Sequence, residues 1–144
     1  MRVAATHGVE DDVDLTGYVP NPLPYMRECA VFALSSRFEG YSLVLAEALA
    51  AGCKVVSTDC ESGPREVLRS GQFGRLVPVG SVNKLADALD SALDARHDPS
   101  PQQEWIRRLS FDKVIDRYEQ LLCPPSRSQS TEVEPAGRLV LGEA

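Results

Sequence analysis

Residues 35–52 read SSRFEGYSLVLAEALAAG, and most of what the sequence says about fold and function is concentrated there. After a strand-like run comes a turn at Gly40, and then a nearly all-apolar helix at about residues 42–51, closed by Gly52. This helix carries one carboxylate, Glu47, and burying a carboxylate is costly unless polar groups meet it. A helix N-terminus behind a glycine turn also binds anions. The segment therefore predicts a pocket that holds a phosphate at one end and hydroxyl groups at the other.

The composition limits the class of protein. The chain has 144 residues, of which 43% are hydrophobic and 25% charged, as expected for one soluble globular domain. The net charge is −6 and the Lys and Arg residues are scattered, which argues against nucleic-acid binding. We find neither a signal peptide nor a transmembrane segment in the sequence, so we expect a cytoplasmic protein. The four cysteines form no C-x-x-C pair and are expected to be reduced thiols.

The hydrophobic pattern predicts alternating strands and helices. Strands are expected at residues 13–16, 30–34, 53–58 and 75–79. Helices are expected at residues 23–29, 42–51, 64–70, 99–109 and 111–122, with another that begins after Ser81. This order predicts an α/β fold, a Rossmann-like parallel sheet with helices on both faces, whose ligand lies beyond the carboxyl ends of the strands. Residues 1–123 are expected to form this domain, and residues 124–144 a disordered tail.

The predicted pocket has two kinds of polar group. The backbone N–H groups of Tyr41, Ser42 and Leu43 lack partners at the start of a helix, and a pyrophosphate is a natural acceptor for them. Glu47 lies about one and a half turns into the helix, where ribose hydroxyls are plausible donors to its carboxylate. Two plainer interpretations remain open. Glu47 could form a structural salt bridge with Arg65 or Lys54. Glu39, in the turn before the helix, could be an ordinary exposed loop acid.

Residues 38–48, FEGYSLVLAEA, resemble the motif of two glutamates separated by seven residues in retaining glycosyltransferases of family 4, which have the two-domain GT-B fold. The segments TGYV at 16–19, GCKVVSTD at 52–59 and SGPREVL at 62–68 resemble further family motifs, so the resemblance covers about residues 13–122. The form SGPRE of this last motif resembles the one in bacterial enzymes that use UDP-hexose or UDP-N-acetylhexosamine to build lipopolysaccharide, capsule or other glycans.

The resemblance implies a role for each matched position. Glu39 is the catalytic residue that contacts the donor sugar, and Glu47 binds the ribose hydroxyls. The other donor-binding positions act through their backbone: Gly40, Tyr41, Ser42 and Leu43 near the diphosphate, and Gly17, Tyr18 and Val19 near the base. The reaction would transfer a hexosyl unit, with retention, from a nucleotide sugar to a glycan or lipid-linked acceptor. No metal and no cofactor beyond the donor substrate are implied.

Two positions depart from the family pattern. The usual proline before Val55 is Lys54, and the usual glycine after the aromatic residue is Ser42, which keeps the N–H group. The resemblance also implies that the chain is the C-terminal, donor-binding half of a GT-B enzyme, truncated at its N-terminus. A separate N-terminal acceptor-binding half would complete the cleft, and the chain by itself would bind donor weakly and transfer little or no sugar. The enzyme would be cytoplasmic or peripheral at the inner membrane face.

Two other functions remain open. One is a non-catalytic nucleotide-sugar-binding or interaction module, which would have the same site without the reaction. The other is a sugar-nucleotide epimerase of similar architecture, which lacks the two-glutamate spacing.

Overall fold

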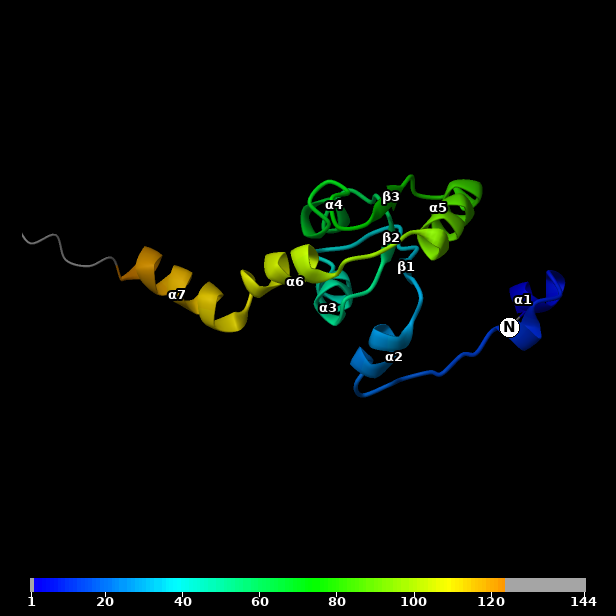
Figure 1. Ribbon diagram of the computed structural model, residues 1–144, viewed down its shortest axis with the longest axis horizontal. Coiled ribbons are helices and arrows are strands. Elements are labelled where there is room, and N and C mark those ends of the chain that lie inside the picture. The colour runs from blue at the N-terminus through cyan, green and yellow to red at the C-terminus, as the bar shows by residue number, and fades with distance from the viewer. Residues whose placement is uncertain (1, 124–144) are drawn as a thin grey trace, which may run out of the picture. The chain divides into compact units, whose positions relative to one another are not determined.

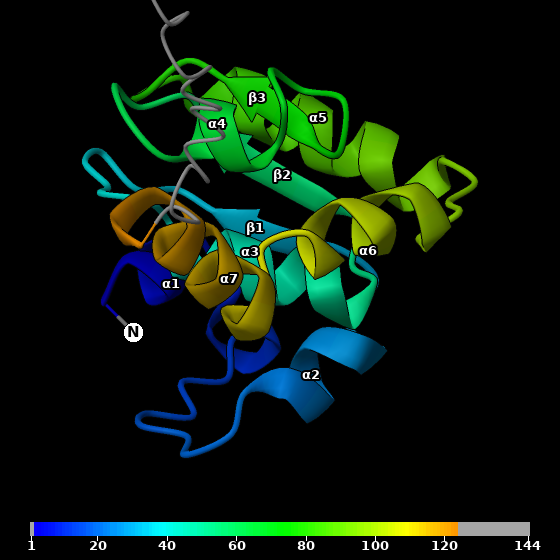
Figure 2. The same cartoon turned by 90° about the vertical axis from the view of Figure 1, so that its left-hand side faces the viewer.

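The computed structural model describes residues 2–123, in which residues up to Ser110 form one compact unit and a second unit begins at Phe111. The first unit contains a parallel sheet with the order β1 (Phe32–Leu34), β2 (Val55–Thr58) and β3 (Arg75–Val77). Figure 2 shows the three strands side by side in this order. This confirms the predicted parallel sheet.

The helices follow the predicted order. In the first unit they are α1 (Arg2–Thr6), a 3₁₀ turn at Glu10–Asp12, α2 (Leu23–Glu28), α3 (Leu43–Ala51), α4 (Pro64–Val67), α5 (Val82–Asp94) and α6 (Ser100–Arg107). The second unit contains α7 (Phe111–Leu122), as predicted. The tail predicted at residues 124–144 lies outside the described residues, and the domain boundary at residue 123 stays a prediction.

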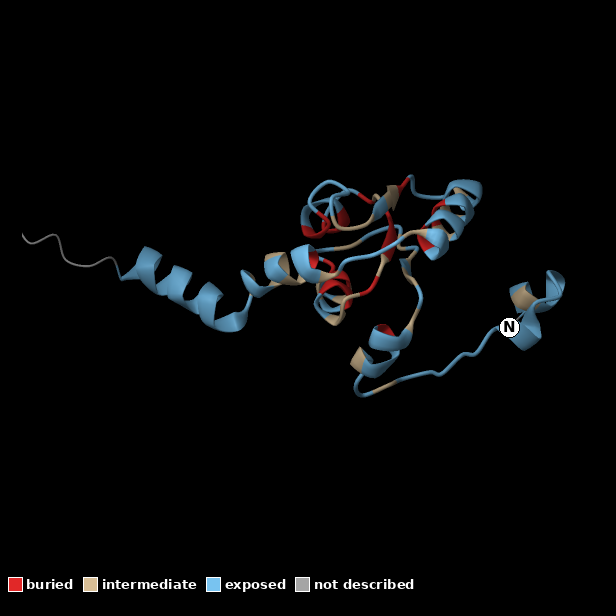
Figure 3. Ribbon diagram, viewed as in Figure 1, coloured by how far each residue is buried: buried red, intermediate tan, exposed pale blue. Residues whose placement is uncertain are grey.

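The core consists of two layers, one on each face of the sheet. All four residues of the central strand β2 are buried, and neighbouring residues point to opposite faces. Val55 packs with Leu49 of α3 on one face, and Val56 packs with Ala88 and Ala92 of α5 on the other. Figure 1 shows α5 on one side of the strands and α3 and α4 on the other, and Figure 3 shows the buried residues gathered on β2 and on these helices. Helices on both faces of the sheet are thus confirmed.

Local chemistry explains both the end of α3 and one departure from the family pattern. Gly52 closes the helix with a φ of 94°, and its N–H group donates to the carbonyls of Ala48 and Leu49. Lys54 stands where proline is usual, and its Nζ donates to the carbonyl oxygens of Ala92 and Leu93, at 2.9 and 3.0 Å. Both residues lie in the last turn of α5, which ends at Asp94, so the ammonium group satisfies free carbonyls at the negative end of that helix.

The strand predicted at residues 13–16 is wrong. These residues form no regular element, and Leu15 is 66% exposed. Within residues 2–123, no hydrogen bond joins residues 14–20 to another residue. The alternation of apolar and polar residues is only a local signal, and a strand also needs a neighbouring strand to pair with its backbone.

Candidate functional site

Two loops meet at the carboxyl edge of the sheet. One follows β1 at residues 35–42, and the other follows β2 at residues 59–63. Gly63 has a φ of 89°, and a Cβ added there would lie 2.5 Å from the carbonyl oxygen of Gly40. The Oγ of Ser62 donates to the carbonyl oxygen of Glu39 at 2.8 Å. The first glutamate of the motif therefore lies at the sheet edge where the sequence predicts a ligand.

The side chain of Glu39 is held by a hydrogen bond and is not a freely exposed acid. The residue is half-buried, and the Oγ of Ser36 donates to its Oε1 at 2.6 Å. The Oγ1 of Thr58, in the central strand, donates in turn to the carbonyl oxygen of Ser36 at 2.5 Å. The plainer interpretation of Glu39 as an ordinary exposed loop acid is therefore wrong.

The N-terminus of α3 has an unusual backbone. Ser42, which directly precedes the helix, has φ 61° and ψ 59°. This left-handed conformation favours glycine because a Cβ crowds the neighbouring carbonyl group, which gives a physical reason for the glycine usual at this position. Ser42 is only 4% exposed, and its Oγ has no hydrogen-bond partner among the described residues.

The first N–H groups of α3 are free, as predicted. The first helical hydrogen bond at this end runs from the N–H of Leu45 to the carbonyl of Ser42, at 3.0 Å. Within residues 2–123, the N–H groups of Tyr41, Ser42, Leu43 and Val44 have no acceptor. Unpaired N–H groups and the positive end of the helix dipole together suit an anionic group.

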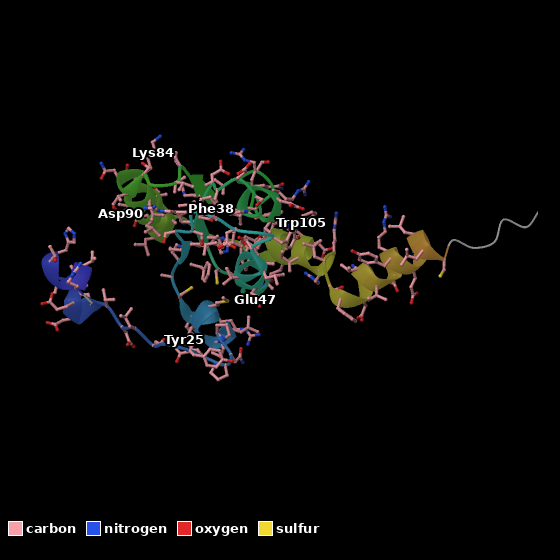
Figure 4. All side chains as sticks on the ribbon, turned by 180° about the vertical axis from the view of Figure 1, so that it is seen from behind. Tyr25, Phe38, Glu47, Lys84, Asp90 and Trp105 are labelled. Atoms are coloured by element: carbon pink, nitrogen blue, oxygen red, sulfur yellow. The ribbon has the colours of Figure 1, made fainter. Side chains whose placement is uncertain are left out.

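The expected burial of Glu47 is wrong. The residue is exposed, and together with Leu43 and Ala50 it forms an uncovered stripe along α3. In Figure 4, Glu47 lies on the outer side of the helix. The apolar composition of α3 suggested burial on every side, but its buried residues, such as Leu45 and Leu49, cover only the inner faces.

The two salt bridges considered for Glu47 are not formed. Arg65 pairs with both carboxylate oxygens of Asp59, and Lys54 donates to the carbonyls at the end of α5. Within residues 2–123 no ion pair or hydrogen bond involves the Glu47 side chain. Its carboxylate is therefore available to a ligand at the surface.

A cavity of about 440 Å³ adjoins Tyr41 and lies between α4 and α6, with Arg69 and Trp105 in its lining. Partial burial, and then the negative charge of Glu66, raises the pKa of the Tyr41 phenol. The Trp105 ring contacts Phe73, which stacks on it, and the guanidinium of Arg69, which lies 4.8 Å from its centroid. These contacts hold α6 against the segment that follows α4.

The predicted base-binding residues are not brought to this site by any contact. Gly17 and Tyr18 are exposed, the latter by 90%, and Val19 is half-buried. Their segment makes no hydrogen bond to the loops at the sheet edge. Their proximity to a nucleotide base stays a prediction.

Residues 2–123 contain no group of three His, Cys, Asp or Glu side chains placed to hold a metal ion. No helix in the same range has the length and hydrophobicity needed to cross a bilayer.

The hydroxyl groups around Glu39 were missed by sequence reasoning. Ser36 lies three residues before Glu39, a spacing at which a hydroxyl can reach a carboxylate, and this signal could have identified it. Thr58 and Ser62 lie in and after the next strand, so their contacts depend on how the two strands pair.

Residues 1–95 match the protein family described as "Glycosyl transferases group 1". The chain belongs to this family. Among relatives, it is 41% identical over 108 residues to the N-acetylgalactosamine-N,N'-diacetylbacillosaminyl-diphospho-undecaprenol 4-alpha-N-acetylgalactosaminyltransferase of Campylobacter jejuni. The match covers 74% of this chain and 30% of that relative, so the chain spans about a third of its length.

Solved structures of glycosyltransferases have the same fold. The lipopolysaccharide outer core galactosyltransferase WaaB in its apo form matches with a TM-score of 0.72 and 22% identity, over 84% of this chain and 36% of that one. The C-terminal domain of a glycosyl transferase group 1 family protein, LpcC, from Francisella tularensis matches with a TM-score of 0.56 and 24% identity, over 81% and 59% of the two chains. The predicted fold, part of a GT-B glycosyltransferase, is confirmed.

Proposed function

We propose that this chain is the donor-binding domain of a retaining glycosyltransferase that transfers a hexosyl unit from a nucleotide sugar to a glycan or lipid-linked acceptor. The family match supports transferase chemistry. The observation that carries the proposal is the free N-terminus of α3, where four successive N–H groups lack acceptors within the described residues. A nucleotide diphosphate presents oxygens of the charge and geometry that these donors require.

The spacing along α3 fits the parts of a nucleotide. Leu43 and Glu47 lie four residues apart on one exposed stripe, which places them about 6 Å apart along the helix axis. A diphosphate on the N–H group of Leu43 then has its ribose near the Glu47 carboxylate. The exposure of Glu47 supports this role better than burial would, because an uncovered carboxylate can accept hydroxyl hydrogens without moving other side chains.

Glu39 is the proposed catalytic residue and contacts the donor sugar. The residue lies four positions before Leu43, the first residue of α3, and one of its carboxylate oxygens is held by Ser36. The free N–H groups stabilise charge on the departing diphosphate, and such stabilisation is commonly the largest catalytic contribution. The acceptor oxygen bonds to the anomeric carbon on the face from which the diphosphate leaves, so the anomeric configuration is retained. UDP is the proposed nucleotide, no metal is required, and Gly17, Tyr18 and Val19 are proposed near the base.

The acceptor and the second wall of the cleft are also proposals. The Campylobacter relative is named for an undecaprenol-linked diphosphate acceptor, and a lipid-linked glycan is the class we propose here. The acceptor is held by an N-terminal half, and the chain alone binds donor weakly and transfers little sugar. We place the reaction in the cytoplasm, at the inner membrane face.

Calorimetric titration of the chain with UDP tests the donor site. We expect Glu47→Gln to weaken UDP affinity about tenfold, the loss expected for hydrogen bonds to a charged group. The matched control is Asp90→Asn on the exposed surface of α5, which removes the same charge away from the site (Figure 4). Equal UDP affinity for the wild type and Glu47→Gln would contradict the ribose role.

A second candidate, a non-catalytic nucleotide-sugar-binding module, is favoured by the openness of the site. Leu43 and Phe38 beside it are 70% and 87% exposed. Sugar transfer measured with UDP-glucose and UDP-N-acetylgalactosamine, with and without an added acceptor-binding half, separates the two. Donor binding without transfer in either mixture would favour the module.

A further inference from the structure

Glu39 is connected to the central strand of the sheet through two hydroxyl groups. We propose that Ser36 and Thr58 are positioning residues that fix the Glu39 carboxylate for contact with the donor sugar. The inference rests on the proposed function, because Glu39 must contact the sugar for its orientation to matter.

The first link is a short hydrogen bond. The Oγ of Ser36 lies 2.6 Å from Oε1 of Glu39, the length typical of a hydroxyl that donates to an ionised carboxylate. Within residues 2–123, no hydrogen bond reaches the second oxygen, Oε2. One oxygen is thus held by the protein, while the other can accept a hydroxyl hydrogen of the sugar.

The second link fixes Ser36 itself. The Oγ1 of Thr58 donates to the carbonyl oxygen of Ser36 at 2.5 Å, and the carbonyl of Leu34 lies farther away, at 3.3 Å. A threonine hydroxyl has one hydrogen, so the shorter contact is the bond that forms. Thr58 is 4% exposed and lies at the end of the central strand, which is buried throughout. A rigid strand therefore determines the position of the loop residue that holds the carboxylate.

A third hydroxyl group, from the loop after β2, also forms a hydrogen bond with Glu39. The Oγ of Ser62 donates to the backbone carbonyl of Glu39 at 2.8 Å. This contact is exposed to solvent, so we assign the larger effect to Ser36 and Thr58, whose bonds are partly buried. The carboxylate and the backbone of Glu39 are then both restrained before any ligand arrives.

The test compares two affinities measured by calorimetry on the same chain, for UDP and for a nucleotide sugar. The probes are UDP-glucose, UDP-N-acetylgalactosamine and GDP-mannose, with UDP and GDP as the sugar-free references. If the hydroxyl groups had only a structural role, their removal would lower the thermal stability or reduce the affinity for both ligands equally. A positioning role changes the ratio of nucleotide-sugar to nucleotide affinity.

The variants form matched pairs. Thr58→Val removes the hydroxyl at nearly constant shape, while Thr58→Ser keeps it. Ser36→Ala removes the hydroxyl that donates to the Glu39 carboxylate. Its control is Ser35→Ala, which changes the exposed serine next to it. We expect Thr58→Val and Ser36→Ala each to lower the ratio about fivefold, the loss of one net hydrogen bond, while Thr58→Ser and Ser35→Ala preserve it.

A double variant adds an independent readout. If Ser36 acts through Glu39, then Ser36→Ala combined with Glu39→Gln lowers the ratio no further than Glu39→Gln alone, because residues in one network are not additive. A ratio that falls in Glu39→Gln but stays at the wild-type value in Ser36→Ala and Thr58→Val would overturn this inference and leave the proposed function standing. Absence of nucleotide binding by the wild-type chain would overturn both.

Discussion

The Cα of Gly63 faces the backbone of Gly40 so closely that no side chain fits between them. A methyl group at Gly63 would lie 2.5 Å from the carbonyl oxygen of Gly40 and 3.1 Å from the carbonyl carbon of Tyr41. The loop after β2 therefore supports the backbone that leads into α3. Since the obstacle is backbone, it cannot be relieved by the rotation of a side chain.

We expect Gly63→Ala to lower the free energy of unfolding by about 2–3 kcal/mol, because strain at a positive φ adds to a steric clash. The displaced loop should also weaken UDP binding. The control is Gly80→Ala, which has a similar φ of 78° but open space around the added methyl, and should cost only about 1 kcal/mol. Equal losses for the two variants in chemical denaturation would contradict the close contact.

Ser42→Gly should stabilise the chain by about 1 kcal/mol. Glycine relieves the left-handed backbone at φ 61° and removes a buried hydroxyl that has no partner among the described residues. Ser42→Ala removes the hydroxyl but keeps the strained backbone, so its stability should lie below that of Ser42→Gly. A lower unfolding midpoint for Ser42→Gly than for the wild type would argue against strain at this position.

Lys54→Met should lower the free energy of unfolding by about 1–2 kcal/mol, because the carbonyl groups at the end of α5 lose the ammonium group that donates hydrogen bonds to them. Lys84→Met, on the exposed surface of the same helix, is the control and should be nearly neutral. UDP affinity should not change in either variant. An unchanged unfolding midpoint in Lys54→Met would show that this capping contact contributes no stability.

The buried thiol of Cys53 should resist alkylation. Burial, with the neighbouring Cys29 thiol, raises its pKa to about 12, so the thiol stays protonated at pH 8. Iodoacetamide at pH 8 should therefore modify the exposed Cys123 first, as mass spectrometry of the peptides can measure. Because the folded chain binds this proton more tightly than the unfolded chain, its contribution to stability should fall as the pH rises from about 9 toward 12.

The layers of the fold could be predicted because their signals are local. The run AVFAL at residues 30–34 is continuously apolar and contains β1, and Gly52 marks the end of α3 through a conformation that other residues rarely adopt. The free N–H groups before α3 followed from the same reasoning, since every helix leaves its first donors unpaired.

The exposure of side chains and the contacts between distant residues could not be predicted, because they depend on which surfaces pack together. The composition of α3 did not reveal that Glu47 lies on the one stripe left uncovered. The hydrogen bond from Thr58 to Ser36 joins residues 22 positions apart, and only the pairing of β1 with β2 brings them together. The alternation at residues 13–16 was misleading because no strand pairs with it.

The most direct test of the central claim is a titration of the ¹⁵N-labelled chain with UDP, followed by amide chemical shifts. The diphosphate should move the amide signals of Tyr41, Ser42, Leu43 and Val44 most strongly, with a smaller change at Glu47 from the ribose. Signals of α5, on the far face of the sheet, should stay in place. Saturating UDP that leaves these four amides unmoved, or that shifts only residues elsewhere on the chain, would contradict the donor site at the start of α3.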